Sequence, residues 1–286
     1  MSEPSKTRRR IALITGAAGG MGRACARLLG RRYRLALVDI GQESLDTLAA
    51  SLVEEGLEIA LAARCDIGVR EEVAALARAL GGAGDLGAVA HTAGLSPVLA
   101  SWKPIIQVNL VGTALLYEAL DPLVGDGTAV VSIASMAAHI APKDPAIDAV
   151  IDHPLAPDLI ARLEPILADL VAQGAPEGGA AYCLSKRGVV RLSERQAAAW
   201  GPRNARVTTI SPGMIWTPMG RKETEEGDPT GAQRLFENTP LRRWGTPYDI
   251  ANAVDFLTSD LASFISGSDL KVDGGAIAVT LGGATL

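Results

Sequence analysis

The sequence lacks most features that mark secreted, membrane-spanning or metal-binding proteins. Its 286 residues include only three cysteines, at positions 25, 65 and 183. Three thiols so widely spaced are too few for a disulfide framework or a zinc site, so a reduced, cytoplasmic setting is expected. No apolar run approaches the roughly 20 residues that a membrane-spanning helix needs, and the short run at 11–14 is no signal peptide. No membrane association is predicted.

Charge of one sign is also scarce. The formal net charge is −5, and the one basic run, at 8–10, is best explained as a solvated N-terminal tail. Nucleic acids and anionic membranes are therefore not expected as partners. Hydrophobic residues make up 48% of the chain, which is enough to build a sizeable core.

Short apolar segments alternate with helical patterns along the chain. Strands are expected at 11–15, 33–39, 57–65, 86–91, 128–134, 206–210 and 269–272, and helices at 20–29, 43–55, 69–80, 105–119, 180–200 and 247–257. Apolar strands separated by helices predict a parallel sheet covered on both faces. The predicted fold is therefore α/β, a doubly wound (Rossmann) parallel sheet of about seven strands flanked by helices. Residues 1–286 are predicted to form a single domain.

Two segments break this alternation. Residues 139–179 contain a turn-rich start and then a helical pattern over 158–173, in which Pro165 is expected to kink or interrupt the helix. Residues 217–243 are polar and rich in Gly and Pro, which is typical of a substrate loop that closes over a ligand. Each segment could instead be a simple surface elaboration.

A glycine-rich turn follows the first predicted strand. Gly16, Gly20 and Gly22 would let the backbone approach a diphosphate at the N-terminus of the next helix. Asp39, at the end of the second strand, can accept hydrogen bonds from both ribose hydroxyls of an adenosine, or could cap a turn. A carboxylate there repels a 2′-phosphate and no basic residue lies in the turn, so NAD is expected rather than NADP. Asp66 could bond the adenine amino group or cap the next helix.

Tyr182 and Lys186 lie one turn apart on one face of a predicted helix. At that distance Lys186 is expected to favour the phenolate and so to lower the pKa of Tyr182. Tyr182 could then exchange a proton with an alcohol or a carbonyl near neutral pH. A proton-transfer group combined with a dinucleotide-binding site predicts hydride-transfer chemistry. The protein is therefore expected to be an enzyme, an oxidoreductase.

With these residues in place, the chain resembles the short-chain dehydrogenase/reductase family, in its single-domain NAD-dependent branch. The motifs Thr-Gly-x-x-x-Gly-x-Gly at 15–22 and Tyr-x-x-x-Lys at 182–186 have the family's order and distance, and 91–94, 212–217 and 272–275 also match. The resemblance implies that Tyr182 is the general acid/base and that Lys186 binds the nicotinamide ribose. It also implies that Ser135 hydrogen-bonds the substrate oxygen and that Asn109 holds a proton-relay water. His91 and Thr92 replace the family's usual asparagines.

The turn and the resemblance together imply the residues around the ligands. Those expected to contact NAD are Gly16, Ala18, Gly20, Met21, Gly22, Asp39, Ile40, Asp66, Ile67, Thr92, Ala93, Gly94, Tyr182, Lys186, Pro212, Gly213, Ile215 and Thr217. The substrate wall is expected to consist of Leu95, Ser96, Ser135, Ala137, Met214, Trp216 and Met219. Because most of this wall is apolar, a small hydrophobic alcohol or ketone is the expected partner.

Charged residues outside this set are expected to form solvated surface. The first group contains Arg221, Lys222, Glu223, Glu225, Glu226 and Arg234, where the signs of charge alternate. The second contains Asp148, Asp152, His153 and Asp158, for which polar surface is favoured over a metal site. No metal is predicted.

The separation of 47 residues between Ser135 and Tyr182 is far longer than in most of the family. This insertion, with short matches at 137–139 and 197–201, is loosely similar to the bacterial 3α-hydroxysteroid dehydrogenase/carbonyl reductase subgroup. That resemblance implies a 3-hydroxy or 3-oxo steroid. The alternatives are an NAD-dependent reductase of a smaller cyclic or aromatic ketone and a non-catalytic NAD(H)-binding sensor. A homodimer or homotetramer is expected, since the helices of Asn109 and Tyr182 commonly pack on a second subunit in this family.

Overall fold

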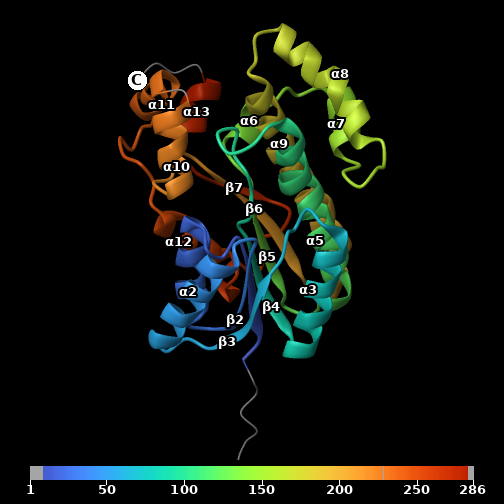
Figure 1. Ribbon diagram of the computed structural model, residues 1–286, viewed down its shortest axis with the longest axis vertical. Helices are drawn as coiled ribbons and strands as arrows, with labels where there is room; N and C mark the ends of the chain where they lie inside the picture. The colour runs from blue at the N-terminus through green and yellow to red at the C-terminus, as the bar shows by residue number, and fades with distance from the viewer. Residues whose placement is uncertain (1–8, 228, 283–286) are drawn as a thin grey trace, which may run out of the picture.

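The computed structural model describes residues 9–227 and 229–282. Seven strands form one parallel sheet in the order β3-β2-β1-β4-β5-β6-β7 (Figure 1). They are β1 (Ile11–Thr15), β2 (Arg34–Asp39), β3 (Ile59–Arg64), β4 (Leu86–His91), β5 (Ala129–Ile133), β6 (Arg206–Pro212) and β7 (Asp269–Val272). The predicted doubly wound α/β fold is confirmed.

Helices cover both faces of the sheet, because successive strand residues point to opposite sides. In β1, Ala12 and Ile14 belong to one buried apolar cluster, whereas Ile11 and Leu13 belong to another. The first cluster includes residues of α1 (Gly20–Leu29), α2 (Gln42–Glu54) and α12 (Pro247–Leu257). The second includes residues of α3 (Arg70–Ala83), α5 (Gly112–Leu120) and α9 (Glu177–Trp200). In Figure 1 the two sets of helices lie left and right of the sheet.

The strand order reverses between β1 and β4, since the chain proceeds outward from β1 to β3 and then returns to β4 on the other side. In open α/β sheets, ligands bind at the carboxyl ends of the strands beside such a reversal. The glycine-rich turn that follows β1 and the segment that follows β4 both lie there. The topology therefore places the predicted cofactor seat and the predicted substrate wall at one edge of the sheet.

The predicted helix at 105–119 consists of three elements. These are α4 (Trp102–Ile105), the π-helical segment η1 (Ile106–Val111) and α5. Asn109 lies in the π-helical segment, where each turn contains one extra residue. Short 3₁₀ turns complete the fold at η2 (Asp121–Leu123), η3 (Gly201–Arg203) and η5 (Asp260–Ala262).

The insertion forms α6 (Ala137–Ile140), α7 (Pro145–Ile151) and α8 (Leu159–Ala172), of which α7 and α8 form the upper right of Figure 1. Pro165 does not interrupt α8, contrary to one of the expected outcomes. Leu159, Leu163 and Leu167 of that helix are buried in an apolar cluster with residues of α4, η1, α7 and α9. We attribute the continuity of α8 to this buried face, which offsets the loss of one backbone hydrogen bond at proline.

Ion pairs join α7 and its C-cap residue Asp152 to α9. Arg187 donates to both carboxylate oxygens of Asp148, at 2.6 and 2.7 Å, and Arg191 donates to both oxygens of Asp152, at 2.7 and 2.6 Å. Arg195 also pairs with Asp152. The expectation that Asp148 and Asp152 are merely solvated surface is therefore wrong, because their carboxylates are only 14% and 21% exposed.

The segment 217–243 is largely helical rather than an irregular loop. It contains α10 (Pro218–Lys222), the π-helical turn η4 (Glu223–Gly227) and α11 (Pro229–Glu237), and it lies beside the terminal helix α13 (Ala276–Gly282) (Figure 1). Within residues 9–227 and 229–282, every helix is too short or too polar to cross a bilayer.

Candidate active site

The three glycines of the turn are required by close packing. Gly16 has a φ of +63°, and a Cβ there would lie 2.8 Å from backbone atoms of Ala93. A Cβ on Gly20 would lie 2.8 Å from Cγ2 of Thr217, and one on Gly22 would collide with the carbonyl oxygen of Gly16. Side chains are therefore excluded from the turn, which leaves its backbone open to a diphosphate.

Asp39 lies beside this turn. Its Oδ2 accepts a hydrogen bond from Ala18 N at 2.9 Å, and its Oδ1 accepts one from Gly41 N at 3.1 Å. The carboxylate is thus fixed at the end of β2, where it ties two turns together, which is the capping role considered as its alternative. Sequence reasoning missed Arg23, whose Nε donates to the carbonyl oxygen of Ala18 at 2.7 Å.

Other residues expected at the adenosine end have mixed environments. The Ile40 side chain is 60% exposed, next to Asp39. Asp66 Oδ1 accepts from Gly68 N at 2.8 Å, within the turn before α3. Asp66 does not cap the next helix, contrary to its alternative role, because the N-cap of α3 is Val69. Ile67 is buried in the apolar core, so its side chain is not available to a cofactor.

His91 and Thr92 connect β4 to the glycine turn. His91 is buried, and its ring nitrogens bond Thr15 Oγ1 at 2.6 Å and Thr113 Oγ1 at 2.9 Å. Burial, assisted by the charge of Lys186, lowers the pKa of His91 to about 3. The Thr92 hydroxyl donates to the carbonyl oxygen of Thr15 at 2.7 Å. A neutral histidine and a threonine therefore tie β1, β4 and α5 together at the positions of the family's asparagines.

Asn109 positions the chain that follows β4. Its Oδ1 accepts from Leu95 N at 2.8 Å, and its Nδ2 donates to Leu95 O at 2.9 Å and to Ser185 Oγ at 3.2 Å. Its own carbonyl oxygen accepts from the Thr113 hydroxyl at 2.6 Å. Gly94 packs against this amide, because a Cβ there would lie 3.1 Å from Asn109 Oδ1 and 3.4 Å from Lys186 Nζ. The side chain of Asn109 is thus engaged with Leu95 and Ser185, beside Lys186.

Tyr182, Lys186 and Ser135 line one cavity. The Lys186 ammonium lies 5.8 Å from the centroid of the Tyr182 ring and donates to the carbonyl oxygen of Ile133 at 2.8 Å. Burial lowers the pKa of Lys186 to about 8, although the charge of Glu223 opposes that shift. Ser135 is nearly buried, and its Oγ accepts from Ala137 N at 3.2 Å.

The expected lowering of the Tyr182 pKa is wrong. Tyr182 keeps some exposure to the cavity but is enclosed by protein, and this burial raises its pKa above the usual range. The Ser135 hydroxyl, as a hydrogen-bond partner, opposes the rise, and the charge of Glu223 adds to it. Desolvation of the phenolate therefore outweighs the attraction to an ammonium at this distance.

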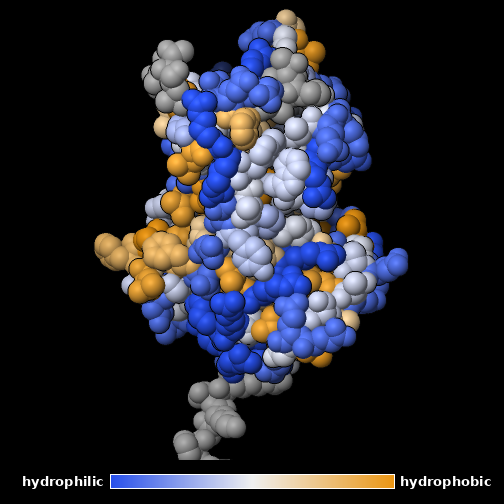
Figure 2. All heavy atoms as spheres, turned by 90° about the vertical axis from the view of Figure 1, so that its left-hand side faces the viewer, coloured by the Kyte–Doolittle hydropathy of each residue, from blue (hydrophilic) through white to orange (hydrophobic). Residues whose placement is uncertain are grey.

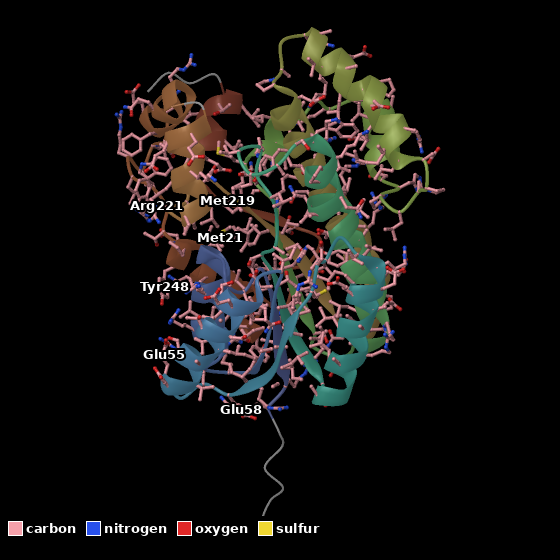
Figure 3. The ribbon with its side chains drawn as sticks, viewed as in Figure 1. Met21, Glu55, Glu58, Met219, Arg221 and Tyr248 are labelled. Carbon is pink, nitrogen blue, oxygen red and sulfur yellow. The ribbon has the colours of Figure 1, made fainter. Side chains whose placement is uncertain are left out.

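The cavity has a volume of about 470 Å³ and brings together residues from seven stretches of the chain. Its lining includes the expected residues Met21, Thr92, Gly94, Leu95, Ser135, Ala137, Tyr182, Lys186, Pro212, Gly213, Met214, Ile215, Thr217 and Met219. Met21 of α1 and Met219 of α10 lie near one another along this cleft (Figure 3). Unexpected lining residues are Met136, Ile140, Glu223, Leu235 and Thr280.

Two expected substrate residues do not line the cavity. Trp216 instead packs against Trp244, with ring centroids 5.2 Å apart, and is 44% exposed. Ser96, which follows Leu95 in the sequence, is fully buried and does not reach the cavity. The expectation that Glu223 belongs to a solvated surface is also wrong, because its side chain is half-buried and reaches the cavity.

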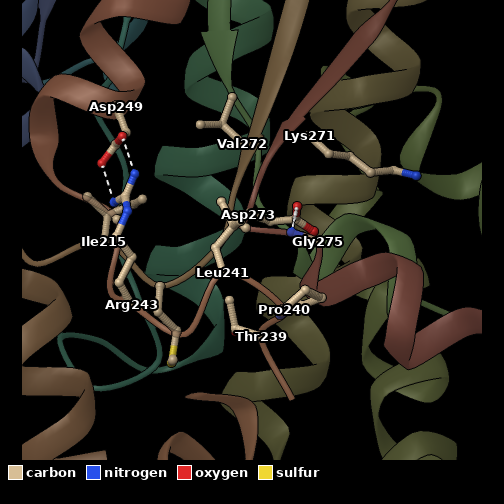
Figure 4. Close-up of a pocket in the computed structure, with 13 residues that line it drawn as sticks. Ile215, Thr239, Pro240, Leu241, Arg243, Asp249, Lys271, Val272, Asp273 and Gly275 are labelled. Carbon is tan, nitrogen blue, oxygen red and sulfur yellow. Dashed lines mark hydrogen bonds and ion pairs between the residues drawn. The ribbon is translucent and has the colours of Figure 1, made fainter. Parts of the chain in front are cut away.

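A neighbouring cavity of about 530 Å³ shares Met214 and Ile215 with the first, but Ser135, Tyr182 and Lys186 do not line it. Figure 4 shows Arg243 and Asp249 paired at its edge, with hydrogen bonds of 2.9 and 2.8 Å. We assign no chemistry to this second cavity. Among the described side chains, no group of three or more His, Cys, Asp or Glu residues is placed to hold a metal ion.

The fold and this site together define a Rossmann-type oxidoreductase that uses a nicotinamide cofactor. Comparison with known proteins agrees. Residues 10–144 match the family model described as short chain dehydrogenase, and residues 166–276 match the one described as Enoyl-(Acyl carrier protein) reductase. The chain belongs to the short-chain dehydrogenase/reductase family, whose members act on alcohols and ketones.

Relatives with named activities cover nearly the whole chain. D-threitol dehydrogenase of Mycolicibacterium smegmatis is 33% identical over 278 residues, which is 93% of this chain and 92% of the relative. Cis-4-hydroxycyclohexanecarboxylate dehydrogenase of Sinomonas cyclohexanicum is 29% identical, over 94% and 97% of the two chains. The crystal structure of levodione reductase has a TM-score of 0.75 at 26% identity, over 95% and 98% of the two chains. Residues 145–165, which include α7, lie outside both family-model matches.

Proposed function

We propose that the protein is an NAD-dependent dehydrogenase that interconverts a hydrophobic secondary alcohol and its ketone, with a one-ring substrate favoured. The observation that carries this proposal is the meeting of Ser135, Tyr182 and Lys186 at a cavity with mainly apolar walls. Apolar walls favour the binding of a hydrophobic ring, and the hydroxyl groups of Ser135 and Tyr182 can both hydrogen-bond one oxygen on that ring.

Tyr182 would act as the general acid/base. During oxidation its phenolic oxygen accepts the hydroxyl proton of the substrate while the carbon-bound hydrogen leaves as hydride. The bound nicotinamide supplies the hydride acceptor. Ser135 Oγ would donate to the substrate oxygen, and Lys186 would hold positive charge beside the phenol. The burial of Tyr182 favours the protonated phenol, so the phenolate that accepts the proton would need stabilisation from the bound ligands.

NAD is favoured over NADP by Asp39. Its carboxylate is held by Ala18 N and Gly41 N at the place where a 2′-phosphate would bring negative charge. Arg23 argues against this preference for NAD, because its guanidinium donates to the carbonyl oxygen of Ala18 and brings a positive charge to the turn. Comparing the dissociation constants of NADH and NADPH by fluorescence, in the wild type and in Asp39→Ala, tests the choice. NADH should bind at least tenfold more tightly than NADPH, and the variant should lose most of that ratio.

The volume of the cavity limits the size of the substrate. The cavity of about 470 Å³ is lined by segments expected at the nicotinamide as well as by the substrate wall, so the two must share it. A one-ring substrate fits beside a nicotinamide in this volume better than the four fused rings of a 3α-hydroxysteroid. The 3α-hydroxysteroid stays the second candidate because of the insertion at 139–179. The name of the Sinomonas relative denotes a one-ring hydroxy acid.

Absorbance of NADH, with purified protein, NAD and a panel of alcohols, tests the proposal. The panel contains cyclohexanol derivatives, aryl alcohols and 3α- and 3β-hydroxysteroids. Turnover of the one-ring alcohols alone supports the proposal, and turnover of 3α-hydroxysteroids supports the second candidate. NADH binding without turnover of any alcohol would favour the third candidate, a non-catalytic NAD(H)-binding sensor.

We also propose that the protein works as a homodimer or homotetramer in a reduced, cytoplasmic setting. Large apolar side chains are exposed around α12 and β7, namely Phe256, Leu261, Phe264 and Leu270. Figure 2 shows hydrophobic side chains projecting at the left margin of the molecule. All three cysteines are free thiols. Mass by light scattering tests the assembly, and a monomer at micromolar concentration would contradict it.

A further inference from the structure

Glu223 is an acidic side chain in a cavity whose walls are otherwise mainly apolar. It is the first residue of η4, and its half-buried side chain lines the same cavity as Tyr182 and Lys186. Among the described residues that line this cavity, Glu223 and Lys186 are the charged ones. Lys186 donates to the carbonyl oxygen of Ile133, and its ammonium forms no ion pair with Glu223 among the described residues.

The charge of Glu223 acts on the reacting groups. It raises the pKa of Tyr182 and opposes the fall in the pKa of Lys186, so the carboxylate lies within electrostatic reach of both. Burial raises the pKa of Glu223 itself, whereas the Ser96 hydroxyl and the Lys186 charge oppose that rise. The Ser96 hydroxyl is fully buried and forms no well-aligned hydrogen bond with another described residue. The Ser96 hydroxyl is therefore a donor beside the Glu223 carboxylate.

We propose that Glu223 selects uncharged substrates over anionic ones in this cavity. The inference rests on the proposed function, since it concerns the substrate of the same site. A second carboxylate on a bound ring would enter a partly desolvated space already occupied by a negative charge, where repulsion is much stronger than in water. A neutral ring meets no such repulsion, and a hydroxyl or amide on it can donate to Glu223.

This selectivity separates the chain from one of its relatives. The cis-4-hydroxycyclohexanecarboxylate named for the Sinomonas dehydrogenase carries a carboxylate on the ring. The same ring with an uncharged substituent should be accepted here, and the acid should be rejected.

Equilibrium binding tests the proposal without turnover. Protein saturated with NAD is titrated by calorimetry with 4-oxocyclohexanecarboxamide and with 4-oxocyclohexanecarboxylate, two ketones of the same shape that cannot react with the oxidised cofactor. The wild type should bind the amide at least tenfold more tightly than the acid, and Glu223→Gln should reduce that ratio about tenfold. Glu225→Gln is the matched control, because Glu225 lies in the same turn and is exposed.

Equal affinity of the wild type for the two ketones, or an unchanged ratio in Glu223→Gln, overturns the proposal. No binding of the amide to the wild type also overturns it, because the site must accept the neutral ring. Unchanged NAD affinity shows that each variant is folded. Since no hydride is transferred, a missing charge preference and a missing dehydrogenase activity are separate results.

Discussion

The ammonium nitrogen of Lys186 donates to the carbonyl oxygen of Ile133 at 2.8 Å, which joins α9 to the end of β5. The lysine is 5% exposed, and its ammonium forms no ion pair among the described residues. A buried charge compensated mainly by one carbonyl costs stability, as its pKa of about 8 indicates.

Replacement of this lysine should therefore stabilise the fold and abolish activity. The folded pKa is lower than the unfolded value of about 10.5, so the cost is fully present below pH 8 and disappears as the pH rises through 10.5. Lys186→Met should raise the free energy of unfolding at pH 7 by up to about 3 kcal/mol. Urea denaturation at pH 7 and pH 10.5 measures this. A variant less stable than the wild type at pH 7 would contradict the account.

His91 should make the fold sensitive to mild acid. Its folded pKa of about 3 lies below the unfolded value of 6.5, so its contribution is complete above pH 6.5 and is lost progressively as the pH falls toward 3. Between pH 6.5 and pH 5 the wild type should lose about 2 kcal/mol. His91→Asn, which restores the family's residue, should flatten this part of the profile of unfolding free energy against pH. Parallel profiles for the two proteins would count against a neutral native histidine.

The ion pairs between α7 and α9 should hold the insertion in place. The side chains of Asp148 and Arg187 are both largely buried and are hydrogen-bonded to each other. The hydrogen bond from the guanidinium lowers the pKa of the Asp148 carboxyl. Asp148→Ala leaves a partly buried guanidinium without its bidentate partner and should cost about 1–3 kcal/mol. Hydrogen exchange should become faster in α7 and α8.

Asp158→Ala is the control for that experiment, because Asp158 is exposed and makes no side-chain cap to α8. Equal exchange rates in the two variants would show that the apolar face of the insertion is sufficient to hold it.

Gly20 should be intolerant of even a methyl group. A Cβ there meets Thr217, the residue that caps α10 by accepting from Gly220 N at 3.0 Å. Gly20→Ala should thus displace the start of the segment 217–243 and weaken NADH binding at least tenfold, measured by fluorescence titration. Gly82→Ala, in a helix with open space around the new methyl group, should bind NADH normally and be about 0.5–1 kcal/mol more stable.

The regular part of the fold follows from local pattern. β1, β4, β7, α1 and α12 have the bounds expected from the sequence. The buried strands β1 and β4 and the capped helix α12 are encoded by neighbouring residues, as apolar runs and as a cap followed by proline. The position of Tyr182 and Lys186 on one helix face is encoded in the same local way.

Other features depend on residues that are distant in the sequence. The pairing of Asp148 with Arg187 spans 39 positions and so has no local signal. The π-helical turn at Asn109 has the same apolar residues as an α-helix, and α7 is too short for periodicity to reveal. Glu223 stands in a charge-rich segment that resembles solvated surface, and only the path of α10 and η4 turns it toward the cavity. Burial of Tyr182 likewise arises from packing.

The proposed dehydrogenase activity requires that Tyr182 transfers the substrate proton. The most direct test compares Tyr182→Phe with the wild type in the rate of NADH formation from an alcohol that the wild type oxidises, with NADH affinity measured on the same samples. The account predicts that the turnover number falls at least about 100-fold while NADH affinity changes little. Retention of most of the activity in Tyr182→Phe would contradict the account.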